Sequence, residues 1–119
     1  MTARTPRRAV MSQCEQLPGA ELCFPFGDDA AVFKVGGKMF AILDVARDLG
    51  AVTLKCDPEE AAARCRSEQG VAPGYHMNKR HWITVAPGLV SRELLADLVQ
   101  GSYEIVVASL PRGRRPSPA

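Results

Sequence analysis

Residues 30–43, Ala-Ala-Val-Phe-Lys-Val-Gly-Gly-Lys-Met-Phe-Ala-Ile-Leu, decide the fold that we expect for this chain. Two runs of strand-forming residues flank Gly36-Gly37, and a glycine pair favours a two-residue hairpin because both turn positions then accept positive φ. This tight turn predicts that Phe33 pairs with Phe40. Phe33, Phe40 and Ile42 then share one face of an antiparallel sheet, which is the face expected to meet the core.

The segments around this hairpin predict three helices and three further strands. The expected helices cover residues 5–17, 57–68 and 91–109, and the expected strands cover residues 51–56, 71–76 and 81–85. Each helix begins at a residue that caps helices well, namely Thr5, Asp57 and Ser91, and Gly101 is expected to kink the last one. Residues 21–26 contain Pro25 and read as extended chain or loop. The order helix, three strands, helix, two strands, helix predicts a two-layer α+β fold with an antiparallel sheet of about five strands.

The composition is that of one ordinary globular domain. The chain has 119 residues, of which 46% are hydrophobic and 24% charged, which excludes disordered, collagen-like and coiled-coil classes. No apolar run approaches the ~20 residues that a membrane span needs, and the first residues do not resemble a secretory signal. We therefore expect a flexible arm at 1–4, one domain at 5–111 and a disordered basic tail at 112–119.

Charge is distributed unevenly along the chain. The net charge is +2, but six of the fifteen basic residues lie at the two ends: Arg4, Arg7, Arg8, Arg112, Arg114 and Arg115. The segment 9–111 has nine basic and thirteen acidic residues, so a polyanion would have to meet the ends or a local patch. One such patch is the window between Glu68 and Glu93, which contains no acidic residue.

The sequence offers no recognisable catalytic group. Cys14, Cys23, Cys56 and Cys65 show no Cys-x-x-Cys spacing and are expected to be reduced thiols, three of them on apolar faces. His76 and His81 are five residues apart, which is not a helical ligand spacing, and no third ligand is nearby. We therefore expect no enzymatic activity, no metal and no cofactor.

The acid-free window contains the segment that offers a binding function. Residues 75–82 read Tyr-His-Met-Asn-Lys-Arg-His-Trp. One interpretation is a hairpin whose aromatic residues pack inward and whose charges face water. The other is a wing that binds phosphates, in which Lys79 and Arg80 neutralise charge and Asn78 donates hydrogen bonds. The residues alone leave these two interpretations about equal.

Several blocks of the sequence resemble the MmcQ/YjbR family, in the family's order and with similar gaps. They are residues 24–27, 32–40, 54–58, 73–82 and 102–111, and together they lie within residues 5–111. The most specific block is Pro-Gly-Tyr-His-x-Asn-Lys-x-His-Trp at 73–82. The chain departs from the family's pattern in the basic arms at both ends.

The resemblance implies a fold related to type III secretion chaperones, often called CyaY-like. It also implies a small bacterial cytoplasmic protein that binds DNA through a double wing, with no catalytic residues to carry over. The two wings in this chain are the Gly36-Gly37 hairpin and the Asn78–Arg80 turn. The candidate contacts to double-stranded DNA are Lys34, Lys38, Lys55, His76, Asn78, Lys79, Arg80, His81 and Arg92.

Two alternatives of different classes remain open. One is a protein-interaction or chaperone-like module that binds a protein partner or a second copy and no nucleic acid. The other is a small-ligand pocket around Tyr75, His76, Lys79 and His81.

Overall fold

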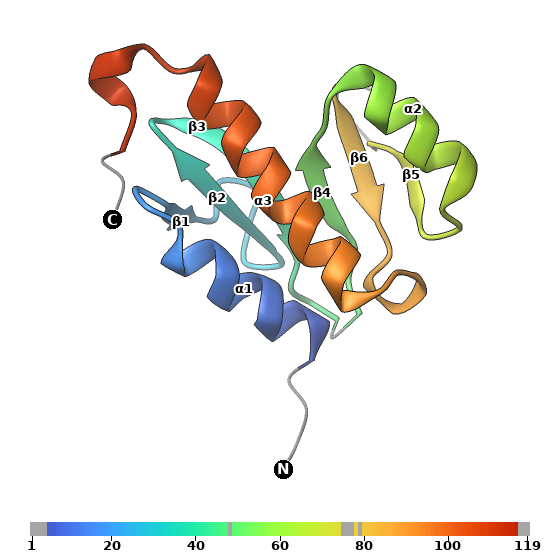
Figure 1. Cartoon of the computed structure of the whole chain (residues 1–119). Coiled ribbons are helices and arrows are strands. Elements are labelled where there is room, and N and C mark those ends of the chain that lie inside the picture. Colours follow the sequence, from blue (N-terminus) through green and yellow to red (C-terminus); the bar gives the residue numbers. More distant parts are fainter. Residues whose placement is uncertain (1–4, 48, 75–77, 79, 117–119) are drawn as a thin grey trace.

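The computed structural model describes residues 5–47, 49–74, 78 and 80–116, and it confirms the two-layer α+β fold (Figure 1). The antiparallel sheet has six strands in the order β1-β2-β3-β4-β6-β5. The helices are α1 (Pro6–Gln16), α2 (Pro58–Ser67) and α3 (Arg92–Ser109), and the strands are β1 (Glu21–Cys23), β2 (Ala30–Val35), β3 (Lys38–Asp44), β4 (Val52–Lys55), β5 (Val71–Pro73) and β6 (Trp82–Val85). Two short 3-10 turns are η1 (Pro87–Leu89) and η2 (Arg112–Arg114). The additional strand is β1, in the segment that the sequence assigned to extended chain or loop.

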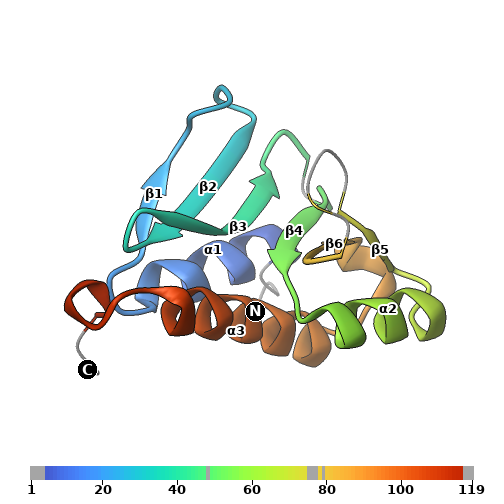
Figure 2. The same cartoon turned by 90° about the horizontal axis from the view of Figure 1, so that it is seen from above.

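The three helices lie on one side of the sheet and leave the other side open (Figure 2). α3 crosses the middle of the sheet, α1 packs beside it, and α2 covers β5 and β6. We call these two sides the helix side and the open face. Within the described residues, no helix combines the length and the hydrophobicity needed to span a membrane.

The three helix starts are those that the sequence predicts. The side chains of Thr5, Asp57 and Ser91 each accept a hydrogen bond from a backbone N–H in the first turn of the helix that follows. These bonds satisfy donors that have no partner inside the helix. α3 runs through Gly101 to Ser109, so the helix that the sequence predicts there is confirmed, but the helix shows no break at Gly101, where the sequence predicts a kink.

The Gly36-Gly37 turn is also confirmed, with φ values of 58° and 83°. The expected pairing of Val35 with Lys38 next to the turn is confirmed, but the expected register is wrong from Phe33 onward, because a β-bulge adds one residue to β3. Phe33 pairs with Ala41, and Phe40 is the extra residue. Phe40 still reaches the core, but Ile42 lies on the open face, where it pairs with Val32.

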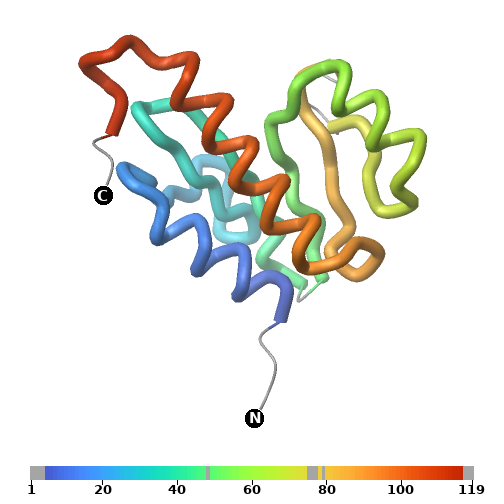
Figure 3. Tube along the Cα trace, viewed as in Figure 1, coloured from blue at the N-terminus to red at the C-terminus, as the bar shows by residue number. Residues whose placement is uncertain are grey.

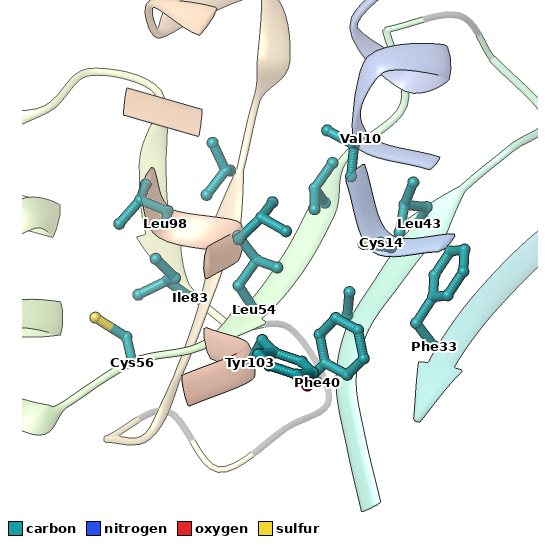
Figure 4. Packing of buried hydrophobic residues seen from close by; sticks show 14 of the residues in the cluster. Val10, Cys14, Phe33, Phe40, Leu43, Leu54, Cys56, Ile83, Leu98 and Tyr103 are labelled. Carbon is teal, nitrogen blue, oxygen red and sulfur yellow. The ribbon is translucent and has the colours of Figure 1, made fainter. Parts of the chain in front are cut away.

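The core lies between the sheet and the helices α1 and α3 (Figure 4). The Phe40 ring contacts two other aromatic rings, with centroids 6.2 Å from Phe33 and 5.3 Å from Tyr103. The Phe40–Tyr103 pair is edge-to-face, an arrangement that aromatic quadrupoles favour. Val10 and Cys14 of α1 complete this side of the core.

A serine hydroxyl in the core joins α3 to two strands. Ser102 has an exposed fraction of 0%. Its Oγ donates to the carbonyl of Phe40 and accepts from the N–H of Lys55 at 2.8 Å. The pairing of β3 with β4 ends at Ala41 and Leu54, one step before these two groups. The hydroxyl therefore bridges β3 and β4 where their own ladder stops.

The basic segment after α3 departs from the expected disordered tail as far as Pro116. Arg115 donates to the carbonyls of Leu110 at 3.0 Å and Ala108 at 3.1 Å, which completes the end of the helix. Pro116 then lies against Gly19, in the turn after α1, and Figure 3 shows the red end of the tube beside that blue turn. The expectations for residues 1–4 and 117–119 fall outside the described residues.

Replacing the bridging serine should weaken the fold. Ser102→Ala leaves a buried carbonyl and a buried N–H without partners, so we expect the free energy of unfolding to fall by about 1–3 kcal/mol. Urea denaturation followed by Trp82 fluorescence measures this. The matched control is Ser109→Ala, because Ser109 also donates to a carbonyl of α3 but is exposed. We expect that variant to stay within about 0.5 kcal/mol, and an equal loss in both variants would contradict the bridging role.

The glycine within α3 should be replaceable with a gain in stability. Apart from its chain neighbours and the nearby backbone of α3 itself, no atom lies within 4 Å of the position where a Cβ would stand on Gly101. Gly101→Ala is therefore expected to raise the free energy of unfolding by about 0.5–1 kcal/mol, because alanine favours the helix. Gly36→Ala is the contrasting variant, since its Cβ would lie 2.5 Å from Leu110 at a positive φ. Thermal unfolding should give shifts of opposite sign for the two variants.

Candidate nucleic-acid interface

Two of the candidate lysines lie on the open face. Lys34 of β2 pairs with Met39, and Lys55 of β4 pairs with Trp82. Both are half-buried, and the Lys55 ammonium lies 6.0 Å from the centroid of the Trp82 ring, at the outer limit of a cation–π contact. Trp82 is buried, although it lies outside the core cluster between the sheet and the helices.

Lys38 lies on the helix side, next to the end of α3. It pairs with the core residue Val35, and its Nζ lies 3.4 Å from the Oγ of Ser109. The docked segment after α3 brings the exposed Arg112 and Arg114 to the same region. No acidic residue occurs between 105 and 116. We call Lys38, Arg112 and Arg114 the basic end.

The basic end joins two segments about seventy positions apart in the sequence. The sequence predicts that this arginine-rich segment is disordered. Arg115 is the residue that could indicate otherwise, because its side chain contacts the last carbonyls of α3 and holds the neighbouring arginines in place. Among the described residues, no carboxylate lies within ion-pair distance of the three cations of the basic end.

In the second expected wing, hydrogen bonds to Asn78 stabilise the turn that leads into β6. The carbonyl of Asn78 accepts from the N–H groups of His81 and Trp82, and its Oδ1 accepts from the N–H of Arg80 at 3.0 Å. The Asn78 amide oxygen therefore shapes the turn. The His81 carbonyl accepts from Cys56 at 2.8 Å and extends the pairing of β4 with β6. His76 and Lys79 lie outside the described residues.

Arg80 is exposed and does not join the basic end. It lines a groove of about 450 Å³ between α2 and β5, together with Glu59 and Cys65. Arg92 is the first residue of α3, and Ser109 beside Lys38 is the last. At 1.5 Å per residue these ends of the helix are roughly 25 Å apart. The nine candidate contacts therefore do not form one patch.

Acidic residues separate the two expected wings. The Gly36-Gly37 turn lies at the same end of the sheet as Pro73, where β5 ends, and Trp82, where β6 begins, because neighbouring strands alternate in direction. Three strand spacings of ~4.8 Å, roughly 14 Å, separate the middle of the β2–β3 pair from the middle of the β6–β5 pair. α2 begins in this interval (Figure 1), and Asp57, Glu59 and Glu60 occupy its N-cap and first turn. These carboxylates complement the helix dipole and repel phosphate between the wings.

The cysteines do not form a nucleophilic site. Burial raises the pKa of the Cys14 thiol to about 12, with a further contribution from Glu15. Burial, then Glu60 and Asp57, raise the pKa of Cys56 to about 11. Both thiols are therefore protonated at neutral pH and pack as small apolar groups. Within the described residues, no group of three His, Cys, Asp or Glu side chains could hold a metal ion.

The fold and this arrangement of side chains define a small α+β protein with one helix-covered and one open sheet face. The YjbR family model matches residues 15–105. The chain belongs to the YjbR family.

Two named relatives are similar to this chain over most of its length. The uncharacterized protein YbdF of Escherichia coli O157:H7 is 43% identical over 98 residues, covering 82% of this chain and 80% of YbdF. The uncharacterized protein YjbR of Escherichia coli K12 is 33% identical over 107 residues, covering 89% and 91%.

Solved structures agree with the fold. The crystal structure of Deinococcus radiodurans protein DR2400, with a DUF419 domain, superposes with a TM-score of 0.86 at 38% identity, over 95% of this chain and 89% of that one. A crystal structure of a Pseudomonas syringae protein has a TM-score of 0.70 at 23% identity, over 84% and 97%, and shows the likeness of fold alone.

The raised thiol pKa values predict an order of alkylation. At pH 8 a thiol with a pKa of about 12 is ionised in only about one molecule in ten thousand, and iodoacetamide reacts with the thiolate. We expect Cys23 and Cys65, which are half-buried, to be labelled before Cys14 and Cys56. Peptide mass spectrometry over time measures the order, with guanidinium-unfolded protein as the control in which all four react. Early labelling of Cys14 in the folded protein would contradict the burial described above.

Proposed function

We propose that this protein binds double-stranded DNA through phosphate contacts at the basic end. The observation that supports the proposal is the grouping of Lys38, Arg112 and Arg114 at one edge of a domain whose remaining charge is negative. The segment from 9 to 111 carries four more acidic than basic residues, so a polyanion is attracted locally and repelled elsewhere. Such a role requires the compartment that holds DNA, which in a bacterium is the cytoplasm.

The chemistry of these residues suits phosphate and not base recognition. Arginine offers a planar fork of donors for phosphate oxygens, and lysine offers a point charge. Arg112 and Arg114 lie in a 3-10 turn, which is too short to enter the major groove as a recognition helix. We therefore propose binding that depends little on DNA sequence and strongly on salt.

The proposed duplex contact is confined to the basic end. The start of α2 between the two wings is acidic, and Arg80 lines the α2–β5 groove together with Glu59. A duplex that approached both turns at once would meet the start of α2. Contact at the basic end alone avoids these carboxylates, so the expected number of phosphate contacts is about three.

A protein-binding role is the second candidate, and one observation favours it. β1 is a short edge strand, and Leu22 and Phe24 at this edge are 42% and 45% exposed. Exposed apolar groups beside an unpaired strand edge suit a partner that adds a strand. If the protein binds only a protein partner, it should not change the mobility of DNA in a gel-shift assay at physiological salt. Of the alternative ligand pocket around Tyr75, His76, Lys79 and His81, only His81 belongs to the described residues.

The duplex proposal is tested with fluorescence anisotropy on a 20-base-pair DNA at several salt concentrations. With three phosphate contacts, log affinity should fall against log salt with a slope of about −2.7. The variant Lys38→Gln, Arg112→Gln, Arg114→Gln should remove most of the binding and of the slope. The matched control is Arg8→Gln with Arg66→Gln, which removes two exposed arginines on other elements and should retain most of the affinity. A flat salt response, or equal loss in both variants, would exclude the basic end as the contact.

A further inference from the structure

The open face presents two rows of side chains that run across the strands. The first row lies nearer the Gly36-Gly37 turn and contains Lys34, Met39, Lys55 and Trp82. The second row contains Val32, Ile42, Thr53 and Thr84, which are cross-strand partners of one another in β2, β3, β4 and β6. Val32 is buried, whereas Ile42, Thr53 and Thr84 are partly exposed, so the lysines border a floor formed by these three side chains.

A cavity of about 570 Å³ lies over the second row. Ile42, Thr53 and Thr84 form part of its floor, and Phe26 of the β1–β2 connection forms part of its wall. Phe26 is 65% exposed, more than any other large apolar side chain in the described part of the chain. A solvated aromatic ring at the wall of a cavity is available for stacking.

We propose that the open face binds single-stranded nucleic acid, with phosphates against Lys34 and Lys55 and a base stacked on Phe26. This inference goes beyond the duplex contact, because it uses none of the residues of the basic end. Proteins bind single strands by combining cations that track the backbone with aromatic rings on which bases stack, and an open antiparallel sheet is a known support for such contacts.

The dimensions of the face fit a short stretch of a single strand. Lys34 and Lys55 lie two strands apart, which is roughly 10 Å at ~4.8 Å per strand. The cavity is lined by Ala30, four residues along β2 from Lys34 and roughly 13 Å away at ~3.4 Å per residue. That length corresponds to about four stacked nucleotides at ~3.4 Å, near the lower limit of single-strand sites.

The charges around the face orient the ligand. Glu21 is the cross-strand partner of Lys34, and no ion pair between them is formed within the described residues. Asp29, Asp44 and Arg47 line the far end of the cavity, where the Oδ1 of Asp44 accepts from the N–H of Ala46 at 3.0 Å. Phosphates are thus attracted to the lysine row and repelled from the aspartate end, which places a base at Phe26. A single-stranded nucleic acid fits this face better than an acidic peptide, because every nucleotide carries both a phosphate for the lysines and a planar base for Phe26, whereas a peptide would need an acidic and an aromatic residue at the matching spacing.

The test uses fluorescein-labelled dT₁₂ and U₁₂ in anisotropy titrations from 50 to 200 mM salt. Phe26→Ala should weaken binding about ten-fold and leave the salt slope unchanged, since stacking carries no charge. Phe26→Tyr keeps the ring and should retain the affinity. Lys34→Gln with Lys55→Gln should reduce the slope by about 1.4, at ~0.7 for each phosphate contact on a single strand.

Controls separate this inference from the duplex proposal. The variant Lys38→Gln, Arg112→Gln, Arg114→Gln should leave single-strand binding within about two-fold, and Phe26→Ala should leave duplex binding unchanged. Circular dichroism melts confirm that each variant is folded. Binding of either dT₁₂ or U₁₂ with these effects supports the inference. Absence of binding to both at 50 mM salt, unchanged affinity of Phe26→Ala, or loss only in the basic-end variant would overturn it, as would capture of an acidic peptide in place of the oligonucleotides.

Discussion

The hydroxyl of Ser102 holds α3 against the middle of the sheet, and the two sides of the molecule differ as a result. It accepts from Lys55 and donates to Phe40, so a helix residue completes the hydrogen bonding between β3 and β4. Loss of the hydroxyl would remove a hydrogen-bond partner from both backbone groups, so we expect a change at this position to lower the stability of the fold. Because α3 is held on this side with α1 and α2, the opposite face of the sheet carries no helix.

The same helix decides where positive charge gathers. α3 ends beside the β2–β3 turn, where Leu110 contacts Gly36, and the following segment folds back as far as Gly19. The carbonyls at the end of a helix attract cations, and Arg115 satisfies two of them. Arg112 and Arg114 are thereby held near Lys38. At the start of α2 the helix dipole is positive and favours Glu59 and Glu60. These carboxylates lie between the cations of the two expected wings at this end of the sheet.

The candidate site was only partly predictable from the residues. The sequence places Lys38 beside the hairpin and the arginines near the C-terminus, but it does not show that they are neighbours, because their proximity depends on a contact between positions 38 and 109. Asn78 was expected to donate to a ligand, whereas its Oδ1 accepts from Arg80 within the turn. Phe26 was missed because Phe-Pro-Phe in a loop gives no sign of which sheet face the rings will border.

Local chemistry was sufficient for the elements themselves. Helix caps at Thr5, Asp57 and Ser91, the glycine pair and alternating apolar residues act over a few positions, so the residues alone predict the helices, the hairpin and an antiparallel sheet. The bulge at Phe40, the docking of Arg115 and the bridge made by Ser102 depend on groups that meet only after the chain has folded. Those long-range contacts decide on which side of the sheet Ile42 lies, because a shift of one residue in register exchanges the two faces of a strand. They also decide which cations become neighbours.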